Sequence, residues 1–246
     1  MKKTSAGNRE EHKSLWQRLF PARLEGGSGV EAEADDLEGL AKKAGKNWVK
    51  SKYFDNAEPH MQGQWEKLVY PFIADCDFAS VVDLAAGHGR NSEMLRTVAR
   101  KIYVVDVNVE NIDFCRQRFA GDDRFTFITN NGIDLSALAD ESITLVYSFD
   151  SMVHFDSDVV RAYLKEFKRV LKPGGRAFCH HSNYTRNPGG NIRENPAWRN
   201  FMSQSMMAHY AIKEGLTVAR SKIVAWGETE AESELDCFTL LEKTFT

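Results

Sequence analysis

The stretch Val81 to Arg90, VVDLAAGHGR, constrains the fold of this chain more than any other part of the sequence. Its apolar run predicts a buried strand, its glycines Gly87 and Gly89 predict a tight loop, and the residues from Asn91 predict a helix. Glycine permits backbone angles that other residues avoid, and the first turn of a helix leaves N–H groups without partners. The stretch is therefore a candidate ligand-binding loop at the end of a strand.

A second predicted strand, Lys101 to Asp106 (KIYVVD), ends in an acid nineteen residues after Gly87. An acid at the tip of the strand beside a glycine loop can accept hydrogen bonds from both hydroxyls of a ribose. Glycine turns also join strands to helices for purely structural reasons, but an acid at this distance favours binding. The two features together predict a ligand that contains ribose.

The class of ligand follows from two departures from the dinucleotide pattern G-x-G-x-x-G. Ser92 stands at the third glycine position, and an acid, Asp83, stands four residues before Gly87. A carboxylate at this point would repel a pyrophosphate, whereas it suits the ammonium of an amino acid moiety. The departures therefore disfavour a nicotinamide oxidoreductase.

This stretch resembles the first motif of the class I S-adenosylmethionine-dependent methyltransferases, in particular their small-molecule, type 11 or type 12 domains. The resemblance covers roughly residues 58–243 and includes the turn LKPGG at 171–175. It implies S-adenosyl-L-methionine as the cofactor. The residues implied to bind it are Asp83, Leu84, Ala85, Ala86, Gly87 and Gly89 at the methionine end, Asp106 and Val107 at the ribose, Asn131, Gly132 and Ile133 at the adenine, and Ser148.

Two positions depart from the pattern of that family. Asn131 stands where an acid often reaches the adenine amino group, and it keeps an acceptor oxygen but lacks the charge. The alternative is that Asn131 and Gly132 only form a turn, which is a common use of this pair. Thr144 likewise replaces an acid in the fourth predicted strand.

Strands and helices that alternate along the chain predict an α/β fold. The resemblance implies a Rossmann-like, doubly wound sheet of seven strands, one of them antiparallel, with helices on both faces. The strands are expected over residues 81–83, 101–106, 124–129, 142–148, 176–180, 217–226 and 235–241, and the main helices over 91–100, 110–119, 156–172 and 201–214.

The chain is expected to divide into an extension and one domain. Residues 1–46 are predicted to be mobile or loosely docked, and an amphipathic helix over Glu10 to Leu24 is alternatively a partner-binding helix. Residues 47–246 would form the methyltransferase domain, with N-terminal cap helices and a lid-like insertion around 183–200. Long loops at the mouth of a site commonly bind substrates.

Three histidines are candidates for catalysis, because a histidine takes up a proton near neutral pH. His154 lies in the loop after the fourth strand, where ligands of open α/β sheets bind. This loop, with Ser148, Phe149, Asp150 and Ser151, is where the transferred methyl group and its acceptor are expected to meet. The alternative for His154 is that it only orients this loop. His180 and His181 end the next strand, and at most one of them can face the cleft, since neighbouring strand residues point to opposite sides. Tyr53 and His60 are further candidates for the cleft.

The composition narrows the class of partner. The 246 residues are 42% hydrophobic and 27% charged, as in an ordinary globular domain, and the net charge of −3 provides no field that attracts nucleic acid.

The sequence contains no apolar run of membrane-spanning length and begins without the apolar core of a signal peptide, so a cytoplasmic location is expected. The four cysteines are scattered, and no metal site is expected.

The sequence thus predicts a monomer or homodimer that transfers a methyl group from S-adenosylmethionine to an oxygen or nitrogen of a small-molecule acceptor. Two alternatives remain open at this point. One is a non-catalytic sensor or scaffold that binds S-adenosylmethionine. The other is a methyltransferase that acts on protein or RNA.

Overall fold

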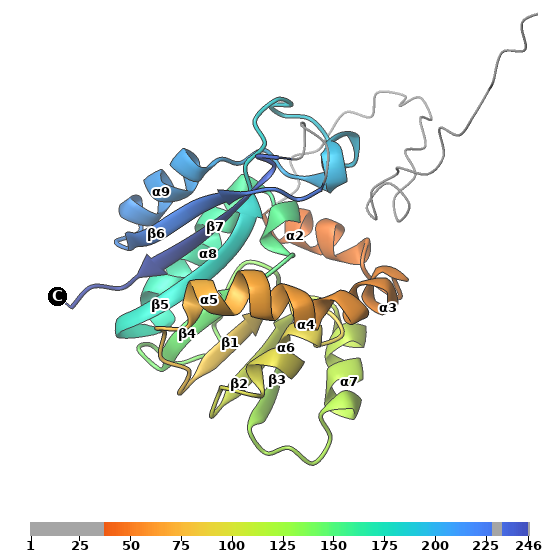
Figure 1. Cartoon of the computed structure of the whole chain (residues 1–246), viewed down its shortest axis with the longest axis vertical. Coiled ribbons are helices and arrows are strands. Elements are labelled where there is room, and N and C mark those ends of the chain that lie inside the picture. The colour runs from red at the N-terminus through yellow and green to blue at the C-terminus, as the bar shows by residue number, and fades with distance from the viewer. Residues whose placement is uncertain (1–36, 228–232, 246) are drawn as a thin grey trace, which may run out of the picture.

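The computed structural model describes residues 37–227 and 233–245, and these residues form one sheet with helices on both faces (Figure 1). The helix predicted over Glu10 to Leu24, with most of the predicted N-terminal extension, lies outside the described residues. None of the described helices is long and apolar enough to cross a membrane.

The sheet has seven strands in the order β3-β2-β1-β4-β5-β7-β6. They are β1 Val81–Leu84, β2 Ile102–Asp106, β3 Phe125–Thr129, β4 Ile143–Ser148, β5 Leu171–Ser182, β6 Thr217–Val224 and β7 Asp236–Glu242. Strands β1 to β5 pair in parallel, and β7 pairs antiparallel with both β5 and β6. The predicted Rossmann-like sheet with one antiparallel strand is confirmed.

The central strands are buried on both faces, which explains why they appear in the sequence as continuous apolar runs. Successive side chains of a strand point to opposite faces. In β1, Val81 therefore packs into one hydrophobic core and Val82 into the other, and Leu145 and Val146 of β4 divide in the same way. Each face of the sheet has its own core, and each core needs a layer of helices.

Helices before and between the strands supply these layers. Before β1 lie α2 Leu37–Lys46, α3 Tyr53–Ala57, η1 Glu58–His60, α4 Met61–Gln64, the π-helical turn η2 Trp65–Val69 and α5 Tyr70–Ile73. The others are α6 Arg90–Leu95, α7 Val109–Arg118, η3 Met152–His154, α8 Ser157–Val170, η4 Ile192–Glu194, η5 Pro196–Trp198 and α9 Gln204–Lys213. In the following, residues 37–57 are called the cap and residues 183–200 are called the lid.

Helix α8 shows how local sequence sets the ends of an element. The Asp156 carboxylate caps its first turn by accepting the Asp158 N–H at 2.8 Å, and its apolar stripe, which includes Phe167, is buried against the sheet. The helix ends at Val170, two residues before the predicted end. Strand β5 begins at Leu171, so the LKPGG sequence forms the first part of a strand.

Replacing Phe167 by alanine should lower the free energy of unfolding by about 3 to 5 kcal/mol, because the fully buried ring would leave a cavity under α8. Urea denaturation followed by circular dichroism measures this change. Ile212→Ala on α9 is the matched control, because this side chain is 67% exposed and its loss should cost less than about 0.5 kcal/mol. Equal losses in the two variants would show that α8 does not anchor the core.

Candidate active site

A cavity open to solvent, with about 750 Å³ of empty space including its mouth, lies at the carboxyl ends of β1, β2 and β4. From β1 the chain continues to β2 and β3 on one side of the sheet, whereas β4 pairs with β1 on the other side. Open α/β sheets bind their ligands at such a reversal of the strand order. Several residues predicted from the sequence line the cavity: Leu84, Ala85, Gly87, Asp106, Val107, Gly132 and His154. The cap also lines it, through side chains of α2 and α3 and through Trp48 between them.

The loop between β1 and α6 turns sharply over the end of the strand. Ala85, Gly87 and Gly89 have φ angles of +57°, +56° and +80°. Residues with a side chain are strained in this region and glycine is not. A Cβ atom on Gly87 would also collide with the ring of Phe54 in α3. Gly87 is therefore required both by the turn and by the cap that packs on it.

The Asp106 carboxylate is fixed at the tip of β2 by groups from two loops. One oxygen accepts the Gly87 N–H at 2.9 Å, and the other accepts the Asn108 N–H at 2.9 Å and the Asn111 side-chain amide at 3.1 Å. Burial raises the pKa of Asp106, and these hydrogen bonds oppose the rise. The acid predicted to contact a ribose is thus held rigidly in the cavity wall.

Two further wall residues offer acceptors that no other described residue uses. The Oδ1 atoms of Asn111 and Asn130 are buried and have no hydrogen-bond partner. The Asn130 amide nitrogen, in contrast, is occupied by the Asp134 carbonyl at 2.8 Å and the Tyr163 hydroxyl at 2.9 Å. Buried acceptors without partners are costly. Together with Asp106, they fit a ligand that brings hydroxyl and amino donors, as adenosine does.

Six of the predicted cofactor residues do not line this cavity: Asp83, Ala86, Gly89, Asn131, Ile133 and Ser148. Asp83 lies buried in β1, where one carboxylate oxygen accepts the Ser92 hydroxyl at 2.5 Å and the other has no partner among the described residues. Burial raises the pKa of Asp83 to about 7. An uncompensated carboxylate thus lies behind the glycine loop.

The side chain of Asn131 closes a turn. Its oxygen accepts the backbone N–H groups of Ile133 and Asp134 at 3.1 Å each, and its nitrogen donates to Glu38 of α2 at 3.0 Å and to Asp134 at 2.8 Å. This is the turn-forming alternative that the sequence left open, and Asn130 takes the place in the cavity wall. The sequence signal for Asn130 was its position as the first residue after β3.

Of the three candidate histidines, His154 is the one in the cavity wall. Its Nδ1 lies 2.8 Å from the Trp198 carbonyl, so Nδ1 carries the proton, and its ring packs on Trp48 with centroids 4.8 Å apart. Burial and the nearby Arg199 charge lower the pKa of His154 to about 4. The imidazole is therefore neutral at physiological pH.

The structure brings neither His180 nor His181 to the cavity. His180 Nδ1 accepts the Asp150 N–H at 3.0 Å, and its Nε2–H donates to Asp236 at 2.9 Å. His181 points to the other face of β5, where its two nitrogens contact the Ser182 carbonyl and the Thr239 hydroxyl, each at 2.8 Å. Both rings are fully buried. Within the described residues, no group of three His, Cys, Asp or Glu side chains is arranged to hold a metal ion.

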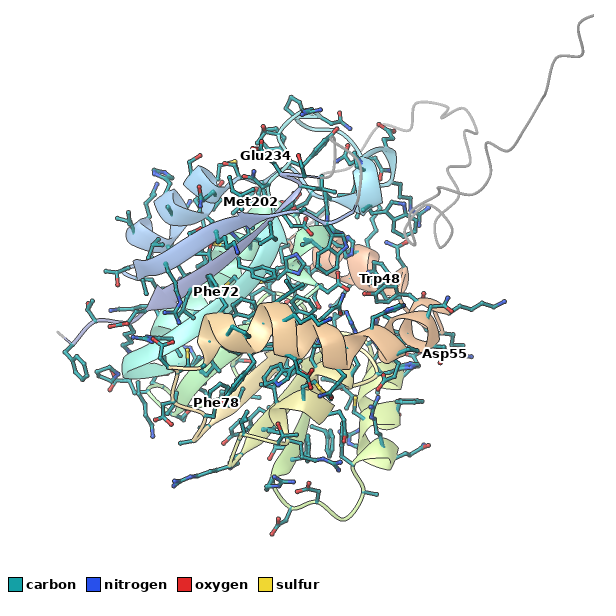
Figure 2. The ribbon with its side chains drawn as sticks, viewed as in Figure 1. Trp48, Asp55, Phe72, Phe78, Met202 and Glu234 are labelled. Carbon is teal, nitrogen blue, oxygen red and sulfur yellow. The ribbon has the colours of Figure 1, made fainter. Side chains whose placement is uncertain are left out.

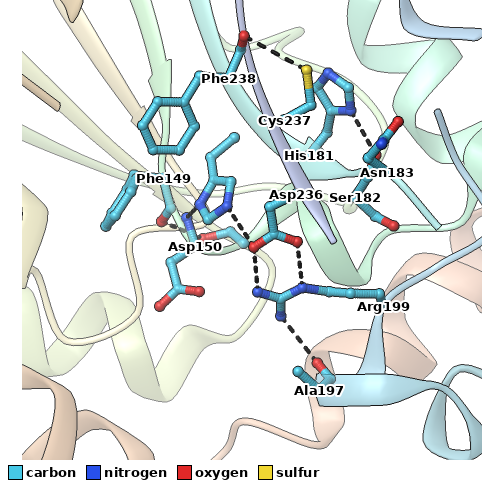
Figure 3. A network of polar contacts seen from close by, with 12 residues as sticks. Phe149, Asp150, His181, Ser182, Asn183, Ala197, Arg199, Asp236, Cys237 and Phe238 are labelled. Carbon is cyan, nitrogen blue, oxygen red and sulfur yellow. Dashed lines mark hydrogen bonds and ion pairs between the residues drawn. The ribbon is translucent and has the colours of Figure 1, made fainter. Parts of the chain in front are cut away.

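A chain of buried polar contacts connects the lid to the loop after β4 (Figure 3). Arg199 donates to both carboxylate oxygens of Asp236 at 2.7 and 2.6 Å, and Asp236 accepts from His180, which in turn accepts from Asp150. Although burial alone raises the pKa of Asp236, the Arg199 charge and His180 lower it to about 2. The sequence placed Asp150 in the active-site loop but gave no sign of these partners.

The cap and the lid meet over the cavity. Trp48, which follows α2 (Figure 2), contacts Trp198 of the lid with ring centroids 5.9 Å apart, and Arg193 of the lid hydrogen-bonds to Asn47. On the other side, the Asn108 side chain donates to the Gly45 carbonyl of α2 at 3.0 Å. The cap, which lines the cavity, is thus held between the lid and the loop after β2.

The strand order, the glycine loop and the fixed acid at the tip of β2 are those of the Rossmann-like fold of class I S-adenosylmethionine-dependent methyltransferases. Residues 82–179 match the sequence model of the family described as "Methyltransferase domain". S-adenosylmethionine is the cofactor of this class.

Known proteins agree with this assignment. The chain is 34% identical over 114 residues to the demethylmenaquinone methyltransferase of Clavibacter sepedonicus, a match that covers 46% of this chain and 44% of that protein. The chain therefore spans less than half the length of this curated relative. Among solved structures, a SAM-dependent methyltransferase from Aquifex aeolicus has a TM-score of 0.58 at 16% identity, with 80% of this chain and 98% of that chain covered.

A second solved structure has a similar degree of likeness. The geranyl diphosphate C-methyltransferase of Streptomyces coelicolor A3(2), in complex with Mg2+, geranyl diphosphate and S-adenosyl-L-homocysteine, has a TM-score of 0.61 at 14% identity, with 87% of this chain and 100% of that chain covered. At such identities, the likeness to both structures concerns the fold.

Asp83→Asn should remove one component of the pH dependence of stability. In the folded chain the pKa of Asp83 is about 7, above the ordinary value of 3.8, so the folded chain binds the carboxyl proton of Asp83 more tightly than the unfolded chain does. The resulting stabilisation of the fold is fully present below pH 3.8 and is lost as the pH rises to about 7. The difference in unfolding free energy between wild type and variant should fall by about 1.4 kcal/mol per pH unit over this window. Urea unfolding at a series of pH values measures it.

The matched control is Asp123→Asn, which changes an exposed acid before β3 and should follow the wild-type pH profile. A constant difference between wild type and Asp83→Asn from pH 4 to 7 would contradict the raised pKa of Asp83.

Proposed function

We propose that the protein transfers a methyl group from S-adenosylmethionine to an oxygen or nitrogen of a small-molecule acceptor. The observation that carries the proposal is the Asp106 carboxylate, held in the cavity wall beside the Gly87 loop by three hydrogen bonds. When bound, S-adenosylmethionine supplies a methyl group on a positively charged sulfur that leaves readily.

The residues of the chain then bind and orient the reactants. Asp106 and Asn111 would accept the ribose hydroxyls, and Asn130 would accept the adenine amino group next to Gly132. Asp83 does not line the cavity, so it would act on the methionine ammonium as a charge behind the glycine loop, and the ammonium would in turn lower the pKa of this buried acid. Trp48 and Tyr53 of the cap and His154 of η3 line the cavity and would shield the reacting atoms from water.

Alignment of the reacting atoms in the cavity is sufficient for most of the catalysis of methyl transfer. The aromatic lining of Trp48, Tyr53 and Phe54 favours a small acceptor over a protein or RNA chain. The relatives named above are, by their names, methyltransferases of demethylmenaquinone and of a carbon of geranyl diphosphate. The second candidate is a sensor or scaffold that binds S-adenosylmethionine without turnover. It is favoured because His154, whose imidazole is neutral, is the one histidine among the described residues that line the cavity.

Asp106→Asn should weaken binding of S-adenosylhomocysteine by about 1.5 to 3 kcal/mol, or about 10- to 150-fold, because the ribose hydroxyls lose a charged acceptor. Isothermal titration calorimetry measures the affinity, and the exposed Asp113→Asn on α7 is the control that should bind as the wild type does. NAD is titrated in parallel. A wild type that prefers NAD, or binds neither ligand, would refute the assignment.

Incubation of the wild type with S-adenosylmethionine and a panel of amines, phenols and alcohols distinguishes an enzyme from a sensor. Release of S-adenosylhomocysteine that depends on one acceptor supports methyl transfer. Tight binding of the cofactor with no turnover on any of the acceptors, extended to protein and RNA, would favour the sensor.

A further inference from the structure

We propose that Asp150 is the residue that binds the methyl acceptor and receives its proton, and that the acceptor therefore presents an O–H or N–H group. This inference rests on the proposed function and names the substrate class of that site. Asp150 directly follows the loop residue Phe149 at the end of β4 and lines two cavities, the main one and an adjoining one of about 310 Å³.

The two oxygens of the Asp150 carboxylate differ. Oδ2 is occupied by the Arg90 guanidinium at 2.6 Å and by the Tyr53 hydroxyl. Oδ1 is buried and has no hydrogen-bond partner among the described residues, and only 1% of the side chain is exposed. In Figure 3 the carboxylate points away from the Arg199–Asp236 pair. One carboxylate oxygen is thus committed to the protein, and the other is left for a donor from the cavity.

The backbone of Asp150 is held in a strained conformation that aims this carboxylate. Its φ angle is +58°, in the left-handed region that residues with a side chain seldom adopt. Such strain persists only where the surroundings enforce it, and it concentrates at functional sites. Here the Asp150 N–H is captured by His180 Nδ1, whose own orientation is fixed by Asp236 and Arg199.

This arrangement also explains why His180 is not available as a base. Its Nδ1 accepts from Asp150 and its Nε2–H donates to Asp236, so both nitrogens are engaged inside the protein. His180 is a positioning residue in this scheme, and Asp150 is the catalytic residue. His154 is the competing candidate, because its ring lies in the cavity wall.

The transfer balances with these groups alone and the proposed cofactor. A bond forms between the acceptor oxygen or nitrogen and the methyl carbon, and the bond from that carbon to the sulfonium sulfur breaks with its electron pair remaining on sulfur. The acceptor proton passes to Asp150 Oδ1. Arg90 keeps its contacts with Tyr53 and Gln64, at 3.0 and 3.2 Å, while the carboxylate is protonated.

Three probes that share a benzyl group test the proposal on the full chain saturated with S-adenosylhomocysteine. Benzylamine and benzyl alcohol carry a donor, whereas benzyl methyl ether has none, and ligand-observed NMR gives their dissociation constants. In Asp150→Asn, Arg90 retains the amide oxygen, which turns the amide nitrogen, a donor, towards the probes. Benzylamine, whose ammonium only donates, should then bind at least 10-fold more weakly; benzyl alcohol, whose oxygen can also accept, should bind more weakly by a smaller factor, and the ether should change by less than 3-fold.

The same experiment includes the controls. Asp123→Asn should bind all probes as the wild type does, and S-adenosylhomocysteine should bind Asp150→Asn within 3-fold of wild type. If Asp150→Asn fails to fold because Arg90 loses its charged partner, the double variant Asp150→Asn with Arg90→Gln removes both charges of the pair and should show the same selective loss.

Several outcomes would overturn the proposal without touching the cofactor assignment. Two of them concern the donor probes: their affinity is unchanged in Asp150→Asn, or neither of them binds the wild type. A third is that Asp150→Asn loses affinity for S-adenosylhomocysteine as much as for the donor probes. The fourth is that His154→Asn, and not Asp150→Asn, selectively loses affinity for the donor probes. Failure of the wild type to bind S-adenosylhomocysteine would refute the proposed function itself.

Discussion

The hydrogen bond from the Gly87 amide to the Asp106 carboxylate ties together the two strand ends on which the site is built. It forms because β1 and β2 run parallel in a register that pairs Leu84 with Val105, so that the glycine loop begins where the acid ends its strand. The loop in turn fixes the start of α6, and with it Arg90, on the other side of the cavity. The cofactor end and the proposed acceptor end of the site thus share one support.

Two ion pairs are buried in this site, and His180 lies between them. Arg90 pairs with Asp150 and Arg199 pairs with Asp236, and all four side chains are nearly or fully inaccessible. Buried ion pairs rarely add stability, because desolvation offsets their attraction, so their value lies in fixing one arrangement. Here they connect α6, the loop after β4, the lid and β7. Arg199 of the lid is thus connected to Asp150 in the cavity wall through Asp236 and His180.

The local sequence was sufficient to predict the features that depend on hydrophobic periodicity and on the positions of the strand ends. The seven strands, the Gly87 loop and Asp106 could be predicted because a parallel sheet places the carboxyl ends of its strands together. The choice between Asn130 and Asn131 could not, because both are short amides and a turn with partners in α2 decides which one faces the cavity. The roles of Asp150 and His180 depend on partners such as Arg90, sixty residues before Asp150.

The glycines of the site serve the cap as much as the ligand. A Cβ atom on Gly87 would meet Phe54 of α3, one on Gly132 would lie 2.7 Å from Ala41 of α2, and one on Gly45 would lie 2.5 Å from Val107. The cap therefore packs against the same glycine backbone, free of side chains, that a cofactor would approach. Because one surface has both functions, closure of the cap and the shape of the cofactor cavity are set together, and neither can change without the other.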